Sequence, residues 1–168
     1  MTKKYDLVIN IGVAGSFRPE ISIGDVVNVV SDSFADLGAE DGDKFMSVFD
    51  LRLQSNDSFP FWNGKIKNEH VDNFKSLRYL KNVKAITVNK VHGNNESIHN
   101  TLLKFHPDIE TMEGAAIFYV CSMEHVPFIQ LRAISNKVEL RNRKAWKMDL
   151  ALDNLTDAVK GFIDKVKH

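Results

Sequence analysis

The chain has 168 residues, 43% of them hydrophobic, with 22 basic and 22 acidic side chains. Such a length is most simply one domain, residues 1–168, with a sizeable core. The formal net charge is zero, so the composition shows none of the excess positive charge typical of proteins that bind nucleic acid or an anionic membrane. No apolar run approaches the roughly 20 residues of a spanning helix, and no signal-peptide pattern is present. The single cysteine excludes an internal disulfide. We therefore expect a cytoplasmic protein.

The first half of the chain predicts two strands and a long irregular segment. Asp6–Val13 is almost continuously apolar and runs into Ala14-Gly15-Ser16, the pattern of a buried parallel strand ending in a glycine turn. Ile23–Val30 is a second predicted strand. Residues 33–64 lack clear periodicity but carry several aromatic side chains, which is typical of a functional loop or an interface. These aromatic residues are Phe45, Phe49, Phe59, Phe61 and Trp62.

The second half predicts alternating strands and helices. Lys84–Val91 is a strand followed by a polar turn, Thr111–Glu124 a helix, Phe128–Ile134 a buried strand, and Ala145–Val166 the longest helix. Together these elements indicate an α/β fold with a largely parallel sheet. On the helix that begins at Thr111, one face gathers the apolar side chains. These are Met112, Ala115, Ala116, Tyr119, Val120 and Met123.

The small residues of Gly12–Ser16 allow two interpretations. Without bulky side chains, backbone N–H groups could approach a planar base or an anion, but a plain strand-to-loop turn explains the motif equally simply. It matches neither the dinucleotide-binding fingerprint nor the phosphate-binding loop, so a nicotinamide or ATP site is disfavoured. The six histidines show no metal-ligand spacing. We expect neither a cofactor nor a metal.

Polar side chains at both ends of one helix–strand unit suggest a small-molecule site. Glu113 opens the helix, where it could face a pocket or simply favour the helix dipole. Arg132 interrupts an apolar strand and needs an anion, either a carboxylate such as Glu113 or a ligand. After Ser135, Asn136 ends this strand, where α/β proteins place their ligands, although a turn asparagine is an alternative.

Four motifs, in order and spacing, resemble the superfamily of purine nucleoside phosphorylases and methylthioadenosine nucleosidases. The resemblance implies a three-layer α/β/α fold with a central mixed, largely parallel sheet. Two further segments are most similar to the futalosine hydrolase branch, which releases hypoxanthine from futalosine in menaquinone biosynthesis. The four motifs lie at 10–16, 87–93, 111–116 and 132–136, and the two segments at 34–41 and 141–146.

The resemblance implies a role for each motif residue. Ala14 and Gly15 would line the purine pocket through their backbone, with Val91 and the main chain of His92 against the base. Glu113 would hold the ribose hydroxyls, Arg132 would order Glu113 and the attacking water, and Asn136 would face the N7/O6 edge of the base. Met112 would lie under the ribose, and Thr111 and Ser135 complete the expected substrate-binding set.

Asn136 also bears on the choice of base. The methylthioadenosine nucleosidases carry aspartate here, and a carboxylate suits the two donors of adenine, its 6-amino group and a protonated N7. A 6-oxo group is an acceptor and suits the asparagine NH₂, while the amide oxygen accepts from N7. The expected reaction is hydrolysis of futalosine to hypoxanthine and dehypoxanthine futalosine. Two alternatives are a purine nucleoside phosphorylase and a relative that binds purine or dimerises without turnover.

Two departures from the resemblance set further expectations. Relatives supply a water-activating glutamate from strands ahead of the segment that contains Asn10, and the short stretch before Asp6 predicts that these strands are missing. Thr111 stands where the nucleosidases have the first glutamate of Glu-Met-Glu. As in relatives, we expect a homodimer, with the aromatic segment 45–62 at its interface.

Overall fold

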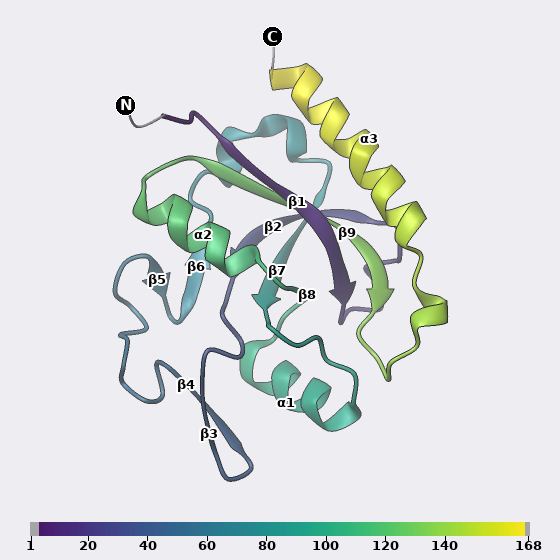
Figure 1. The fold of residues 1–168 in the computed structure, drawn as a ribbon. Helices are drawn as coiled ribbons and strands as arrows, with labels where there is room; N and C mark the ends of the chain where they lie inside the picture. The colour runs from purple at the N-terminus through teal and green to yellow at the C-terminus, as the bar shows by residue number, and fades with distance from the viewer. Residues whose placement is uncertain (1–3, 167–168) are drawn as a thin grey trace.

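The computed structural model describes residues 4–166 and shows a mixed sheet with helices on both faces (Figure 1). The strands are β1 (Val8–Ser16), β2 (Val26–Asp32), β3 (Gly38–Asp41), β4 (Lys44–Ser47), β5 (Phe61–Trp62), β6 (Lys65–Lys67), β7 (Lys81–Thr87), β8 (Ile109–Thr111) and β9 (Phe128–Lys137). The helices are α1 (Asn95–Phe105), α2 (Gly114–Met123) and α3 (Met148–Val166). Short 3₁₀ turns are η1 (Val71–Asn73), η2 (Lys75–Leu77) and η3 (Arg143–Ala145).

The main sheet has the order β5-β6-β2-β7-β8-β1-β9, and a further pairing of β2 with β9 closes part of it on itself. The longest ladders, β1 with β9 and β2 with β7, are parallel, whereas β8 meets β1 and β6 meets β2 in antiparallel fashion. The expected mixed, largely parallel sheet is confirmed. The remaining strands, β3 and β4, form a separate hairpin.

Strand β9 shows why the fold has three layers. Its alternate residues Ile129, Leu131 and Ala133 pack in one cluster with Leu155 and Phe162 of α3. On the opposite face, Phe128 packs against Phe118 of α2 with ring centroids 4.5 Å apart. Both faces of β9 are therefore buried, which explains its continuous apolar sequence. The three-layer α/β/α arrangement agrees with the expectation.

Three local predictions were wrong. Residues 33–64 are not simply irregular, because they contain β3, β4 and β5. Helix α1 follows the polar turn and was not predicted, although Asn94 caps it by accepting a hydrogen bond from the Ser97 N–H at 2.9 Å. Thr111 belongs to β8, and α2 begins only at Gly114. Helix α1 has few apolar residues, and strands β3, β4, β5 and β8 are short. Both therefore give only a weak periodic pattern in the sequence.

The buried face of α2 also differs from the predicted one. Ala115, Phe118 and Cys121 are buried, whereas Val120 is 56% and Met123 45% exposed. Apolar residues surround almost the whole of this helix, so periodicity alone cannot say which side meets the sheet. The exposed apolar side is left as a surface beside the site described below.

Strand β1 has one edge that is largely free of backbone pairing among the described residues. Residues 8–14 pair only with β9, and β8 joins the other edge only at Gly15 and Ser16. Ile11 is 48% exposed, although its strand was predicted to be buried. No helix within residues 4–166 is long and apolar enough to cross a membrane.

Candidate functional site

A cavity of about 480 Å³ lies where β1, β8 and β9 end and α2 begins. Every residue that the sequence singled out for the site lines it, so the structure brings the whole set together. These are Ala14, Gly15, Val91, His92, Thr111, Met112, Glu113, Arg132, Ser135 and Asn136. The cavity is also lined by residues to which the sequence gave no individual role, namely Asn10, Ile11, Gly12, Val13, Glu110 and Trp146.

The free edge of β1 explains how the backbone enters the site. Six consecutive residues, 10–15, line the cavity, although side chains of a strand alternate between its two faces. A ligand can reach all six because no neighbouring strand of the described chain covers this edge before Gly15. The expected backbone contacts of Ala14 and Gly15 thus have the room they need.

Arg132 and Glu113 form the charged part of the cavity. The Arg132 side chain is only 2% exposed, whereas that of Glu113 is 68% exposed, and Nη2 of the arginine lies 3.8 Å from Oε2 of the glutamate. Burial lowers the pKa of the guanidinium, while Glu113 and Asp32 oppose that shift. Among the described residues, neither Nε nor Nη2 has a hydrogen-bond partner. These two nitrogens are sealed from solvent, so the arginine depends on the nearby carboxylate of Glu113 to offset the cost of its burial.

Gly12 makes room for this arginine. A Cβ at position 12 would lie 2.3 Å from Nη1 of Arg132, so any other residue here would have to displace the guanidinium. The two residues are direct partners in the parallel β1–β9 ladder. The glycine motif therefore does more than form a turn, because its first residue lets the guanidinium lie over the strand.

Behind Glu113 lies a buried polar network around Asp32, a residue that the sequence reading missed. Asp32 Oδ1 accepts hydrogen bonds from the Ser33 N–H at 2.8 Å and the Thr87 hydroxyl at 3.0 Å, and Oδ2 accepts from Gln130 Nε2 at 3.3 Å. Burial raises its pKa to about 7, although these hydrogen bonds and Arg132 act in the opposite direction. The Ala115 N–H donates to the Thr87 hydroxyl at 2.7 Å. The network thus holds the first turn of α2, and with it Glu113.

A β-bulge sets the position of Asn136. Ala14 pairs with Ile134, but Gly15 pairs with Asn136, so Ser135 is the extra residue on β9. Bulges of this kind re-aim side chains and are common beside active sites. The Ser135 hydroxyl donates to Asn136 Oδ1 at 2.8 Å, and Asn136 Nδ2 donates to the Lys137 carbonyl at 2.9 Å. The carboxamide is therefore held in a defined orientation and still has one N–H and one lone pair to offer.

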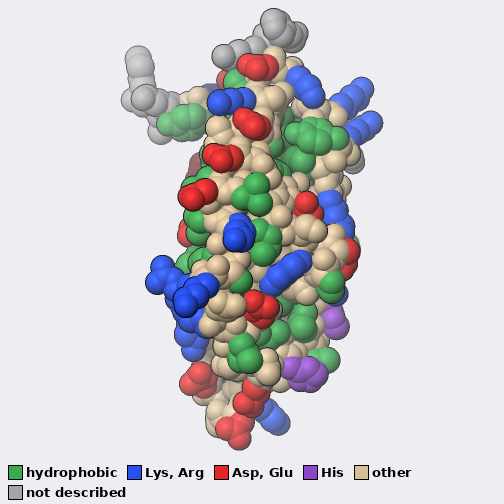
Figure 2. Space-filling view, turned by 90° about the vertical axis from the view of Figure 1, so that its right-hand side faces the viewer, with side chains coloured by type: hydrophobic (Ala, Val, Ile, Leu, Met, Phe, Trp, Pro, Cys, Tyr) green, Lys and Arg blue, Asp and Glu red, His purple; other side chains and the backbone are tan. Residues whose placement is uncertain are grey.

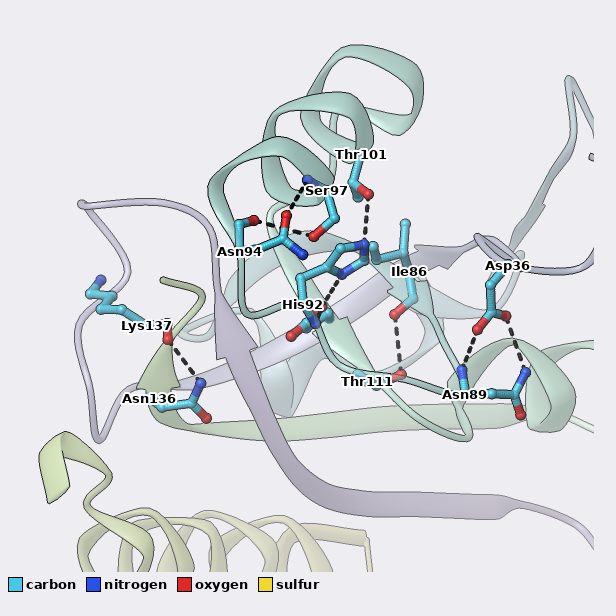
Figure 3. A network of polar contacts seen from close by, with 11 residues as sticks. Asp36, Ile86, Asn89, His92, Asn94, Ser97, Thr101, Thr111, Asn136 and Lys137 are labelled. Carbon is cyan, nitrogen blue, oxygen red and sulfur yellow. Dashed lines mark hydrogen bonds and ion pairs between the residues drawn. The ribbon is translucent and has the colours of Figure 1, made fainter. Parts of the chain in front are cut away.

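His92 is held through its side chain, which the sequence reading did not foresee. Its Nδ1 lies 2.6 Å from Oε2 of Glu110, and its Nε2 lies 2.7 Å from the Thr101 hydroxyl. Figure 3 shows the imidazole directly beneath Thr101 of α1. The Glu110 side chain is only 3% exposed. The sequence offered one signal that Glu110 belongs to the site, namely its position between an apolar residue and Thr111.

Trp146 is the other cavity residue without a sequence-based role. It is partly buried between η3 and α3, and the backbone N–H of the next residue, Lys147, donates to the Ser135 carbonyl at 2.9 Å. This contact brings the indole to the strand end that carries Asn136. The sequence placed Trp146 inside the predicted helix 145–166, whereas the structure begins α3 only at Met148. No group of three or more His, Cys, Asp or Glu side chains suited to a metal occurs within residues 4–166.

Comparison with known proteins agrees with this geometry. A family model described as the phosphorylase superfamily matches residues 2–164. The chain therefore belongs to the phosphorylase superfamily. The futalosine hydrolase of Streptomyces coelicolor is 34% identical over 160 residues, covering 94% of this chain and 65% of that protein. The futalosine hydrolase of Acidothermus cellulolyticus is 30% identical over 162 residues, covering 93% and 64%.

Solved structures support the fold. The chain matches the futalosine hydrolase of Helicobacter pylori with a TM-score of 0.77 and 18% identity, over 95% of this chain and 68% of that one. A methylthioadenosine/S-adenosylhomocysteine nucleosidase from Colwellia psychrerythraea, solved with adenine, also gives a TM-score of 0.77 at 18% identity, over 95% and 66%. The chain spans about 65% of the length of the curated relatives that it matches.

Proposed function

We propose that this chain carries the base- and ribose-binding part of a nucleosidase that hydrolyses the N-glycosidic bond of a 6-oxopurine nucleoside. The proposed substrate is futalosine, which would yield hypoxanthine and dehypoxanthine futalosine, as in menaquinone biosynthesis. The observation that carries the proposal is the fixed Asn136 carboxamide at the edge of the cavity. Its free N–H suits a 6-oxo group, and its oxygen suits a protonated N7.

The other cavity residues take roles that fit this reaction. Glu113 extends into open space at the helix start and would bind the ribose hydroxyls as positive charge develops on the sugar. Arg132, whose Nη2 lies 3.8 Å from Oε2 of Glu113, would hold that carboxylate and help to order the attacking water. Ala14 and Gly15 would contact the base through backbone, Val91 and Met112 would pack on base and ribose, and Trp146 would add an aromatic face.

Product analysis tests this function. The protein is incubated with futalosine, inosine and methylthioadenosine, each with and without inorganic phosphate, and released base is measured by chromatography. Hypoxanthine release without phosphate supports the hydrolase. Strict dependence on phosphate would replace it by a phosphorylase, and purine binding without release would support the alternative of a binding protein.

We also propose that the chain forms a homodimer through the exposed side of α2. Val120 and Met123 of α2 are 56% and 45% exposed, and Met112, just before the helix, is 49% exposed. Next to it, Phe59 is 58% exposed and lies stacked on His125, with ring centroids 5.7 Å apart. Exposed apolar patches of this kind commonly mark protein interfaces. The α3 side is different, since acidic and basic side chains alternate there with isolated hydrophobic ones (Figure 2).

Light scattering of the purified protein tests the dimer. Val120→Glu should give a monomer at concentrations where the parent chain is a dimer. Leu152→Glu, on the outer side of α3 and 46% exposed, is the matched control and should leave the dimer intact. A monomeric parent chain would overturn this proposal without affecting the reaction proposed above.

A further inference from the structure

Three neighbouring strands meet beside the cavity. In the middle strand, Gly15 pairs with Glu110 on β8 and with Asn136 on β9. A Cβ at Gly15 would lie 3.1 Å from Asn136 Nδ2 and 3.4 Å from Glu110 Cγ, so both side chains stand on one face of the strand, with Val138 Cγ2 at 2.9 Å from the same point. With strands about 4.8 Å apart, the two flanking backbones are roughly 10 Å apart. The edge of a flat ring system in the cavity can therefore face the carboxylate and the carboxamide together, because both residues line it.

The Glu110 carboxylate is fixed on one side and free on the other. Its Oε2 accepts from His92 Nδ1 at 2.6 Å, and the His92 backbone N–H lies 3.4 Å away. With Nδ1 donating to Glu110, Nε2 of His92 is left to accept from the Thr101 hydroxyl at 2.7 Å. Among the described residues no donor contacts Oε1, and this oxygen is not one of their sealed, unpartnered polar atoms. Oε1 therefore opens to the cavity as an acceptor.

A free acceptor at this position distinguishes between purines. A 6-oxopurine carries a hydrogen on N1, next to the 6-oxo group, whereas N1 of adenine is an acceptor without hydrogen. A carboxylate pairs with the first and repels the second, and leaving a buried charged group unpaired is costly. Asn136 and Glu110 together thus offer the donor and acceptor pattern that complements the N7, O6 and N1–H edge.

We propose that Glu110 is a second specificity-determining residue, which accepts the N1–H of a 6-oxopurine while Asn136 binds its N7/O6 edge. His92 and Thr101 keep the carboxylate in place. The inference rests on the proposed function and deepens it, because discrimination between hypoxanthine and adenine then depends on two residues from different strands.

Calorimetric titration with free bases tests this role, using the parent chain, Glu110→Gln and the control Glu40→Gln. The control makes the same change at an exposed residue of the β3–β4 hairpin. Glu110→Gln should weaken hypoxanthine binding by about 10- to 100-fold, the loss expected for a hydrogen bond to a charged group, without weakening adenine binding. The parent chain should bind 1-methylhypoxanthine, which lacks the N1–H, as weakly as the variant binds hypoxanthine.

The outcomes separate this inference from the proposed function. Equal hypoxanthine affinity in the parent chain and Glu110→Gln, or equal affinity of the parent chain for hypoxanthine and 1-methylhypoxanthine, would overturn the role of Glu110 and leave the proposed function standing. A parent chain that binds no purine would overturn both. If the variant does not fold, the 1-methylhypoxanthine comparison on the parent chain decides alone.

Discussion

Individual side chains in the cavity have separable tasks because they differ in burial and in partners. Arg132 is buried and has two nitrogens without a hydrogen bond to any described residue, Glu113 is open to solvent, and Asn136 is fixed by its own neighbours. A change at Glu113 or Asn136 should therefore affect the reaction more than the fold.

Glu113→Gln should lower kcat by at least about 100-fold with a much smaller effect on stability. The amide keeps the size of the side chain but cannot carry the negative charge that stabilises the developing cation, and removal of one such electrostatic contact costs about 10²–10³ in kcat. Steady-state kinetics and thermal melting of the variant check this. Glu124→Gln, an exposed carboxylate at the other end of α2, is the control. An unchanged kcat would remove Glu113 from the mechanism.

Asn136→Asp should shift preference toward adenine nucleosides. The new carboxylate loses the N–H that serves a 6-oxo group and gains an acceptor for a 6-amino group, a mismatch of about 1–3 kcal/mol for the 6-oxopurine. The ratio of kcat/KM for inosine to that for methylthioadenosine should fall at least tenfold. A ratio equal to that of the parent chain would refute the base-reading role of Asn136.

At the scale of elements, the first turn of α2 is the part that sets the site. Gly114 allows the helix to begin directly over the buried Asp32, since a Cβ there would lie 2.1 Å from Asp32 Oδ2 and 2.6 Å from Gln130 Nε2. The Thr87 hydroxyl links Asp32 to the Ala115 N–H. The position of α2 therefore depends on the buried side chain of Asp32.

Gly114→Ala should destabilise the protein by about 1–3 kcal/mol, the usual cost of adding a methyl group to a packed interior. Gly161→Ala is the matched control in α3, where a Cβ meets nothing within 4 Å. There, alanine should stabilise the helix by about 1 kcal/mol. Urea denaturation of both variants measures the two effects. Equal effects on the midpoint would mean that α2 does not pack on Asp32 as described.

The sequence could predict the elements with long apolar runs and the residues that carry familiar motifs. Strands β1 and β9 have long apolar sequences, and helix α3 is long, so all three could be predicted. The motif residues of the site lie around one cavity. The bulge at Ser135 could not be predicted, because a single extra residue leaves no periodic signal. Asp32 and Glu110 could not be recognised either, because their roles depend on contacts with residues distant in the sequence. Asp32 contacts Thr87, 55 positions away, and Glu110 contacts His92, 18 positions away.

For the molecule as a whole, one buried carboxyl group links stability to pH. Asp32 is fully buried, and burial raises its pKa from 3.8 to about 7, with opposing hydrogen bonds from Thr87, Gln130 and Ser33. Between these two pKa values the folded chain holds a proton that the unfolded chain has released. The stabilising contribution is thus fully present below about pH 4 and is lost as pH rises through about 7.

The free energy of unfolding should therefore contain a component from Asp32 that falls by up to roughly 1.4 kcal/mol for each pH unit between about pH 4 and 7. Asp32→Asn cannot titrate and should lack this component, whatever constant cost the amide brings to its contact with Gln130. Urea denaturation of both proteins at several pH values, at fixed ionic strength, isolates it as the change in their difference with pH. Asp50→Asn, at an exposed carboxylate of the loop after β4, should leave the difference nearly unchanged over this range, because both its ordinary pKa of 3.8 and its lowered pKa of about 2 lie below it. If the difference between the parent chain and Asp32→Asn is constant from pH 4 to 7, Asp32 is already ionised in the folded protein. Arg132 would then lie near two negative charges, those of Asp32 and Glu113.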